Sequence, residues 1–370
     1  MSQLGYMEKL LDGVEVEWKE LNTLTKVLRG KRLVKSQLSD NEEFPVYHGG
    51  LQPLGYYNSS NRPADTVMII NVGASAGTVG YSSTEFWSSD GCFCIEHSKL
   101  LNNKYLYYVL IGYQHLLRSK VRLAGIPTLD SIIVERLQIP IPPLNIQAEI
   151  VRILDTFTEL TAELTAELTA ELTARQQQYA YYREQLLTFD NNQIQYKRLG
   201  DVVNIKNGKD WKNLGNGDIP VYGSGGVMTY VDTYAYDKPT VLIPRKGSIT
   251  NIFYVETPFW NVDTIYYTEI DTEQILPKFF YYYMKTIDLM KLDTGSGRPS
   301  LTQAILNAIG IPVPSIVEQE RIVSILDKFD ALTTSLTEGL PHEIELRQQQ
   351  YEYYRDLLLS FPKPEVVAHD

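Results

Sequence analysis

The stretch IPIPPLNIQAEIVRILDTF at residues 139–157 recurs as IPVPSIVEQERIVSILDKF at residues 311–329, and RQQQYAYYREQLLTF at 175–189 recurs as RQQQYEYYRDLLLSF at 347–361. Both pairs are offset by 172 residues without a gap. Fainter matches precede them, since Pro45-Val46-Tyr47 corresponds to Pro220-Val221-Tyr222 and Phe86-Trp87 to Phe259-Trp260. The sequence therefore predicts a duplicated chain, in which each copy has a variable region of about 120 residues and a closely matched segment of about 50.

The first matched segment has the pattern of a helix. Apolar residues recur at i, i+3 and i+4 spacing between Ile146 and Phe157, which is typical of an amphipathic helix. Asn145 follows two prolines and is a candidate N-cap. A helix over residues 145–189 would extend for ~68 Å at 1.5 Å per residue. A helix of this length needs a partner, and we expect the two copies to pair antiparallel around a pseudo-two-fold axis.

The second matched segment predicts two helical pieces. Ser315 and Glu318 form a capping box that starts a helix. Gly339 and Pro341 favour a break or kink between residues 338 and 342. The second helical region is therefore expected to run over residues 315–361 with an interruption.

Three tandem Thr-Ala-Glu-Leu units follow Leu160. Four residues rotate a helix by ~400°, so one unit lengthens the helix by ~6 Å and nearly preserves its face. We interpret the array as a spacer; the alternative is a low-complexity helix of good helix formers. The expected spacer residues are Leu160, Leu164, Leu168 and Leu172 in the first copy and Leu332, Leu336, Leu340 and Ile344 in the second.

The charge distribution leaves a DNA-binding function open despite a net charge of −11. Residues 18–140 carry 13 Lys and Arg against 10 Asp and Glu, and residues 196–312 carry 12 against 12. The remaining segments carry 9 against 23, so the acidity belongs to the connecting segments. Because lysine and arginine supply much of the attraction to phosphates, near-neutral variable regions indicate that partner proteins contribute part of it.

The variable regions mix short strand-like runs, such as residues 240–243, 252–255 and 264–267, with helical stretches near 103–118 and 277–290, which predicts α+β domains. Glycine-rich and basic loops separate these elements. Glycine lets backbone amides approach phosphates, and Arg and Lys reach guanine edges in the major groove. Although most basic loop residues are merely solvated, the candidate DNA contacts are Lys31, Arg32, Lys35, Arg122, Lys209, Ser224, Arg245, Lys246 and Arg298.

Motifs for catalysis, metal binding and export are not found in the sequence. No Asn/Asp-Pro-Pro-aromatic loop of an adenine methyltransferase and no Walker A sequence occur. The two cysteines, Cys92 and Cys94, and five scattered histidines do not form a zinc motif. Tyrosine clusters at 105–108 and 281–283 are assigned to core or interface. Without a signal peptide or an apolar run of ~18 residues, we expect a cytoplasmic chain that does not interact with a membrane.

These features together resemble the specificity subunits of type I restriction-modification systems, in the branch with TAEL spacer repeats. The resemblance rests on the duplicated IPIPPL/IPVPS junctions, the TAEL array and the paired RQQQY segments. It implies two target-recognition domains, at residues 18–138 and 191–310. It also implies a central spacer helix at 139–190, a C-terminal one at 311–370, and an N-terminal segment, 1–17, that completes the second helical region.

The same resemblance implies the partners and excludes an activity of the chain's own. The two domains would each recognise half of a split target in double-stranded DNA. The helices would hold them apart and dock two methyltransferase subunits, which nuclease-translocase subunits join. S-adenosylmethionine, ATP and Mg would serve those partners, so this chain would need no cofactor.

Two other functions are kept beside this one. A coiled-coil adaptor that links proteins without reading DNA would also suit duplicated helices and net acidity. An autonomous methyltransferase or nuclease conflicts with the missing motifs. Sequence-dependent DNA binding separates the first function from the adaptor, and activity of the purified chain would support the third.

Overall fold

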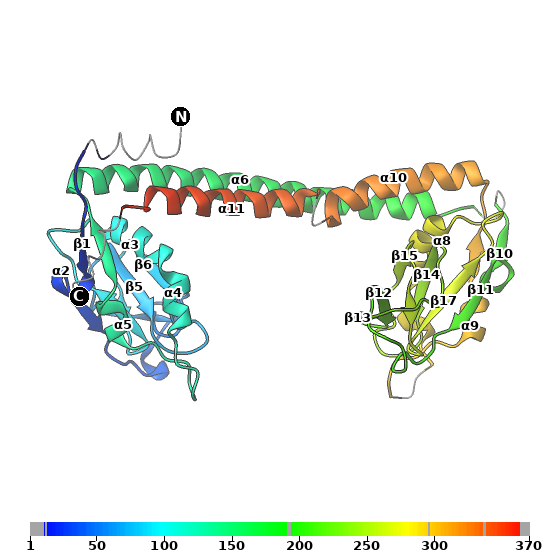
Figure 1. Ribbon diagram of the computed structural model, residues 1–370, viewed down its shortest axis with the longest axis horizontal. Helices are drawn as coiled ribbons and strands as arrows, with labels where there is room; N and C mark the ends of the chain where they lie inside the picture. The colour runs from blue at the N-terminus through cyan, green and yellow to red at the C-terminus, as the bar shows by residue number, and fades with distance from the viewer. Residues whose placement is uncertain (1–10, 12, 191–193, 295–296, 336–337, 363–370) are drawn as a thin grey trace. The chain divides into compact units, whose positions relative to one another are not determined.

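The computed structural model of the chain describes residues 11, 13–190, 194–294, 297–335 and 338–362 (Figure 1). The chain divides into two compact units, unit 1 with residues 1–166 and 345–370 and unit 2 with residues 167–344. Most of the N-terminal segment, 1–17, lies outside the described residues. None of the described helices is long and apolar enough to cross a membrane.

The globular part of unit 1 is built from three small sheets. The first pairs β1 (Glu17–Glu20) with β9 (Gln138–Ile141). The second is antiparallel, in the order β2 (Val27–Arg29), β8 (Cys92–Ile95), β5 (Thr66–Ile70), β6 (Val79–Ser82). The third has the order β4 (Tyr56–Tyr57), β3 (Phe44–Tyr47), β7 (Trp87–Ser88). The helices are α2 (Leu21–Leu24), η1 (Lys35–Gln37), α3 (Asn103–Gly112), α4 (Gln114–Ser119) and α5 (Ser131–Glu135).

The globular part of unit 2 repeats this topology. β10 (Tyr196–Arg198) pairs with β18 (Gly310–Pro312). The other sheets have the orders β11 (Val203–Asn207), β17 (Ile265–Ile270), β14 (Thr240–Pro244), β15 (Phe253–Val255) and β13 (Gly226–Val231), β12 (Ile219–Gly223), β16 (Trp260–Asn261). The helices are α7 (Leu199–Val202), α8 (Pro277–Met284), η2 (Leu289–Leu292) and α9 (Gln303–Asn307). The predicted α+β class and internal duplication are confirmed.

The faint sequence matches mark equivalent strand pairs. Val46 of β3 lies parallel to Trp87 of β7, and Val221 of β12 lies parallel to Trp260 of β16. The Pro-Val-Tyr and Phe-Trp matches therefore come from one sheet that both copies keep.

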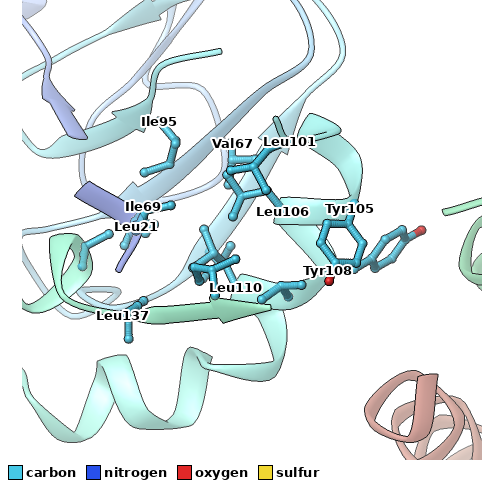
Figure 2. Close-up of a cluster of buried hydrophobic side chains, with 14 of the residues drawn as sticks. Leu21, Val67, Ile69, Ile95, Leu101, Tyr105, Leu106, Tyr108, Leu110 and Leu137 are labelled. Atoms are coloured by element: carbon cyan, nitrogen blue, oxygen red, sulfur yellow. The ribbon is translucent and has the colours of Figure 1, made fainter. Parts of the chain in front are cut away.

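The core of each globular part forms where a helix covers its four-stranded sheet. In unit 1, Figure 2 shows Leu106 and Leu110 of α3 turned toward Val67 and Ile69 of β5. Tyr105 is fully buried in the same cluster. The tyrosine clusters were predicted to belong to a core or an interface. Tyr105, Tyr108, Tyr282 and Tyr283 are buried in the cores, while Tyr107 and Tyr281 are half-buried.

Each unit also contains a pair of antiparallel helical stretches, which we call its stem. The stem of unit 1 joins residues 144–166 of α6 (Leu144–Leu187) to residues 345–358 of α11 (Leu340–Leu358), where the Phe157 and Tyr354 rings lie 5.7 Å apart. The stem of unit 2 joins residues 167–187 of α6 to α10 (Ile316–Thr334), where Tyr179 stacks on Phe329 at 5.9 Å. The predicted pairing of the matched segments is observed within each unit.

Two predicted helix ends need correction. α6 begins at Leu144, because the Pro143 carbonyl accepts the N–H groups of Ile146 and Gln147. Asn145 therefore lies inside the first turn and is not the N-cap. The interruption of the second region falls between the end of α10 at Thr334 and the start of α11 at Leu340, a few residues earlier than predicted.

Gly339 and Pro341 nevertheless explain that interruption. A Cβ on Gly339 would lie 2.6 Å from the Ala331 carbonyl oxygen, so the chain can return this close to α10 only with glycine. Pro341 occupies the first turn of α11, where its missing N–H costs nothing. The Ser315 N-cap is confirmed, because its hydroxyl accepts the Glu318 N–H at 3.3 Å.

A fully buried glutamine joins each stem to its globular part. The Gln147 amide oxygen accepts the Asn102 N–H at 2.8 Å, and its nitrogen donates to the carbonyls of Leu100 and Pro142 at 3.0 and 2.8 Å. Gln147 thereby connects the first turn of α6 to the loop before α3.

Gln319 makes the equivalent three bonds at the start of α10. Its oxygen accepts the Leu276 N–H at 2.7 Å, and its nitrogen donates to the carbonyls of Gln274 and Pro314 at 2.9 Å each. Both copies therefore hold the stem by the same polar contact.

An aspartate on each stem reinforces the junction two turns further along. Asp327 accepts the Tyr282 hydroxyl at 2.6 Å and the Lys278 ammonium at 2.9 Å. In unit 1, Asp155 makes the same contacts with Tyr108 and Lys104, at 2.6 and 2.8 Å. Burial and the bond to Asp327 raise the pKa of Tyr282, so its hydroxyl stays protonated and donates.

We predict that Gln147→Leu destabilises unit 1 by about 2–4 kcal/mol, because it leaves one N–H and two carbonyl groups unpaired in the core. Urea denaturation measures the change. Gln177→Leu, on the exposed face of α6, is the control and is expected to change stability by no more than about 0.5 kcal/mol. Equal midpoints for the two variants would contradict the role of the buried glutamine.

Candidate nucleic-acid interface

The predicted DNA-contact residues occupy loops of the two globular parts. In each part, these loops lie at the end away from the helices of its stem (Figure 1). Strands β2, β11 and β14 run toward this end, and Lys31, Lys209 and Arg245 follow the last residues of these strands within two positions. We call this end of each globular part its tip.

A Gly-Lys pair is fixed at the tip of unit 1. The Lys31 N–H donates to the Ser88 carbonyl at 2.9 Å, and the Trp87 indole N–H donates to the Lys31 carbonyl at 2.7 Å. A Cβ on Gly30 would lie 2.0 Å from the Ser89 carbonyl oxygen, so only glycine fits. The backbone of Lys31 is therefore held on strand β7 while its side chain is exposed.

The tip of unit 2 repeats this arrangement. The Lys209 N–H donates to the Asn261 carbonyl at 2.9 Å, and the Trp260 indole donates to the Lys209 carbonyl at 3.0 Å. A Cβ on Gly208 would lie 2.1 Å from the Val262 carbonyl oxygen. Lys31 and Lys209 are thus equivalent residues, although their offset of 178 exceeds that of the other matches.

A cleft of about 480 Å³ opens at the tip of unit 1. Two predicted residues, Arg32 and Lys35, line it. His48, whose Nδ1 lies 3.3 Å from Asp90 Oδ1, is part of the lining. Further lining residues that the sequence did not single out include Arg29, Asn71 and Thr128.

Asn71 is a buried polar residue in the lining of this cleft, with 3% of its surface exposed. Its backbone N–H donates to the Gly91 carbonyl at 3.1 Å, and its carbonyl accepts the Leu129 N–H at 2.9 Å. Its side-chain Oδ1 has no hydrogen-bond partner among the described residues. A buried amide oxygen of this kind is suited to accept a hydrogen bond from a ligand or a water.

Three predicted residues converge at the tip of unit 2. The N–H groups of Arg245 and Lys246 both donate to the Thr264 carbonyl, at 2.8 and 3.2 Å, and the Ser224 N–H donates to the Thr264 hydroxyl at 3.3 Å. Arg298 precedes Pro299, whose carbonyl accepts the Gly247 N–H at 3.0 Å. The turn between β16 and β17 therefore organises the basic residues of unit 2.

The Arg245 guanidinium is directed by its neighbours. It lies 6.0 Å from the centroid of the Tyr266 ring, and its Nη1 is 3.5 Å from the Asp263 carbonyl oxygen. Burial raises the pKa of Tyr266 against the opposing charge of Arg245, and the protonated hydroxyl donates to the Leu301 carbonyl at 3.2 Å. A cation within ~6 Å of a ring face gains about 0.5–1 kcal/mol at an exposed site, which favours this position of the guanidinium.

Arg122 is not among the residues that line the cleft, although its backbone bonds to Thr128, which lines it, and the described spacer residues lie on α6, α10 and α11. Arg122 pairs with Asp130 at 3.0 Å, and its backbone bonds to Thr128 in both directions. Within unit 1, Leu160 and Leu164 line a groove of about 220 Å³ on the stem. Leu168 and Leu172 on α6, and Leu340 and Ile344 on α11, are half-buried; Leu332 on α10 is 37% exposed, and Leu336 lies outside the described residues.

The internal repeat pointed to only two of the tip residues that were not predicted. Trp87 and Trp260 were matched between the copies, but their contact with the preceding Gly-Lys pairs follows only from the fold. Arg29, His48 and Asn71 come from separate strands and loops, so no local motif joins them. Among the described residues, no group of histidine, cysteine and acidic side chains is arranged to hold a metal.

The sequence model of the type I restriction modification DNA specificity domain matches residues 13–174 and 191–346. The chain belongs to this family. The EcoR124I/EcoR124II type I restriction enzyme specificity subunit of Escherichia coli is 36% identical over 423 aligned positions that cover 100% of both chains.

Solved structures share the fold of this specificity subunit. A chain from a structure of the type I restriction-modification system has a TM-score of 0.67 at 15% identity and covers 94% of this chain and 98% of its own. The specificity subunit from M. genitalium has a TM-score of 0.54 at 22% identity, with 95% and 98% covered.

We predict that Gly30→Ala and Gly208→Ala each displace the Gly-Lys loop of their own tip. The added Cβ overlaps a backbone carbonyl that cannot move freely, which should cost about 1–3 kcal/mol of stability. Fluorescence of Trp87 or Trp260 should also change, because each indole loses its lysine carbonyl acceptor. Gly225→Ala, where a Cβ meets no atom within 4 Å, is the control; an equal effect there would contradict the packing argument.

Proposed function

We propose that this specificity subunit recognises a split target in double-stranded DNA, one half by each tip, and carries modification subunits to it. The observation that supports this most is that the two globular parts have the same fold but different side chains at their tips. Unit 1 has a cleft lined by Arg29, Arg32 and Lys35, and unit 2 has Arg245 and Lys246 over a common turn. Two copies of one scaffold with different side chains are suited to two different half-sites.

The near-neutral globular parts favour a complex with partners over a chain that binds DNA alone. Each phosphate neutralised by a protein adds to the salt-dependent affinity, and the acidic stems do not supply this attraction. Two methyltransferase subunits would contribute it, and nuclease-translocase subunits would complete the restriction complex. S-adenosylmethionine, ATP and Mg would act in those partners, and this chain would have no catalytic role.

The stems are suited to positioning and docking. The first turn of each stem is bonded to the core of its globular part through Gln147 or Gln319. A globular part therefore cannot rotate about its stem helix without breaking buried hydrogen bonds. In unit 1, the groove beside Phe157 and Tyr351 offers an apolar surface on the stem. We assign the domain limits as in the sequence analysis, with readers at 18–138 and 191–310.

Sequence-dependent binding tests this function. The subunit co-purified with its modification partners is titrated with target DNA and with a scrambled duplex of equal length at one fixed salt concentration. We expect the target to bind at least 10³-fold more tightly, as is typical of specific DNA-binding proteins. Equal affinities would favour the adaptor function.

We further predict that deleting residues 169–172, one Thr-Ala-Glu-Leu unit, shortens the tolerated gap between half-sites by one or two base pairs. The helix loses ~6 Å, against ~3.4 Å per base pair. Mapping of methylated sites gives the gap directly. Duplicating residues 169–172 is the matched variant and should lengthen the gap equally, while a change in the bases of either half-site would contradict the spacer role.

A further inference from the structure

The backbone after β5 in unit 1 and after β14 in unit 2 follows one path. The Asn71 N–H donates to Gly91 and its carbonyl accepts from Leu129; in unit 2 the Arg245 N–H donates to Thr264 and its carbonyl accepts from Leu301. All four N···O distances lie between 2.8 and 3.1 Å. Asn71 and Arg245 are therefore the same position of the scaffold.

The equivalence continues two residues further on. The Gly73 N–H donates to the Pro127 carbonyl at 2.9 Å, and the Gly247 N–H donates to the Pro299 carbonyl at 3.0 Å. The two glycines have φ angles of +87° and +85°, a conformation that favours glycine. Only the side chains between the shared bonds differ, with Asn-Val in unit 1 and Arg-Lys in unit 2.

The Gly-Lys pair behaves in the opposite way, because both its backbone frame and its side chain are kept. The ammonium groups of Lys31 and Lys209 are exposed, and neither forms an ion pair or side-chain hydrogen bond among the described residues. The backbone of each lysine bonds to β7 in unit 1 or to β16 in unit 2. The turn after that strand accepts the backbone N–H of Asn71 or Arg245. A constant and a variable residue thus lie on one small frame in each tip.

We propose that Lys31 and Lys209 bind the DNA phosphates common to both half-sites, and that the shared Asn71/Arg245 position determines base identity. This rests on the proposed function. A side chain that is the same in both readers cannot distinguish two half-sites, whereas phosphates are present in both. A side chain that differs on an unchanged frame can distinguish them.

The chemistry of the two variable residues assigns different ligands. Arg245, whose guanidinium lies over the Tyr266 ring, has paired N–H donors that match guanine O6 and N7 in the major groove. Asn71 is shorter and lines the cleft, and its buried Oδ1 has no hydrogen-bond partner among the described residues. We assign to it a hydrogen bond from a water that bridges to a base amino group. The second half-site should therefore contain a guanine at the Arg245 position.

The phosphate role is tested in the complex with the modification subunits. Lys31→Ala and Lys209→Ala should each reduce the slope of log K against log salt by ~0.9 and weaken binding to target and scrambled DNA by the same factor. The control pair is Lys19→Ala and Lys197→Ala, equivalent lysines on β1 and β10, the strands that pair with β9 and β18 ahead of the stems. An unchanged slope for the first pair, or an equal change for the control pair, would overturn the assignment.

The base-reading role is tested with Arg245→Asn. We expect target affinity to fall roughly 5- to 150-fold, the range of one base contact, with scrambled DNA unaffected and methylated sites relaxed at one position of the second half-site. Asn71→Ala should relax the first half-site only, and its urea midpoint shows whether unit 1 is folded. Equal losses on both duplexes, or no loss, would refute the proposal.

Failure of this inference differs from failure of the proposed function. If the unaltered complex does not prefer its target over scrambled DNA, the function itself is wrong. If the complex has that preference and Arg245→Asn leaves it intact, only the assignment of this position is wrong.

Discussion

A buried side-chain amide at the start of each stem is the constraint on which the rest of this structure depends. Gln147 and Gln319 each satisfy one N–H and two carbonyl groups that would otherwise be unpaired inside the protein. Two turns further along each stem, Asp155 and Asp327 each accept hydrogen bonds from a tyrosine and a lysine. Because unpaired buried polar groups are costly, a globular part and its stem helix behave as one body, and the direction of the helix fixes the direction of the tip.

This rigid junction explains why the two copies diverge so unevenly. Residues around the junction must keep the same hydrogen bonds, so the IPIPPL and IPVPS segments stay alike. Side chains exposed at the tips, such as Arg32 and Lys246, are not held in either core and can differ between the copies. The Gly-Lys pairs at the tips are an exception, because only glycine fits against the neighbouring carbonyl groups at positions 30 and 208.

Much of this could be predicted from the sequence, because a repeat fixes topology once one copy is understood. The duplication, the helical segments, the α+β class and the interrupted second helix followed from spacing, glycine and proline. The Asn145 cap was wrong, because Pro143, two residues earlier, supplies the first helical carbonyl. The sequence showed the tips only as separate basic loops. The equivalence of their positions follows from hydrogen bonds between distant segments, such as Asn71 to Gly91, which the repeat in the sequence does not reveal.

The central claim is that the two globular parts are interchangeable readers on equivalent junctions. It is tested most directly by replacing residues 18–138 with residues 196–310 and mapping methylated sites in a host that expresses the chimera with its modification partners. The account predicts a target in which both half-sites are the former second half-site, with the gap unchanged. A folded chimera that methylates the original split sequence, or one whose gap changes while its half-sites do not, would contradict it.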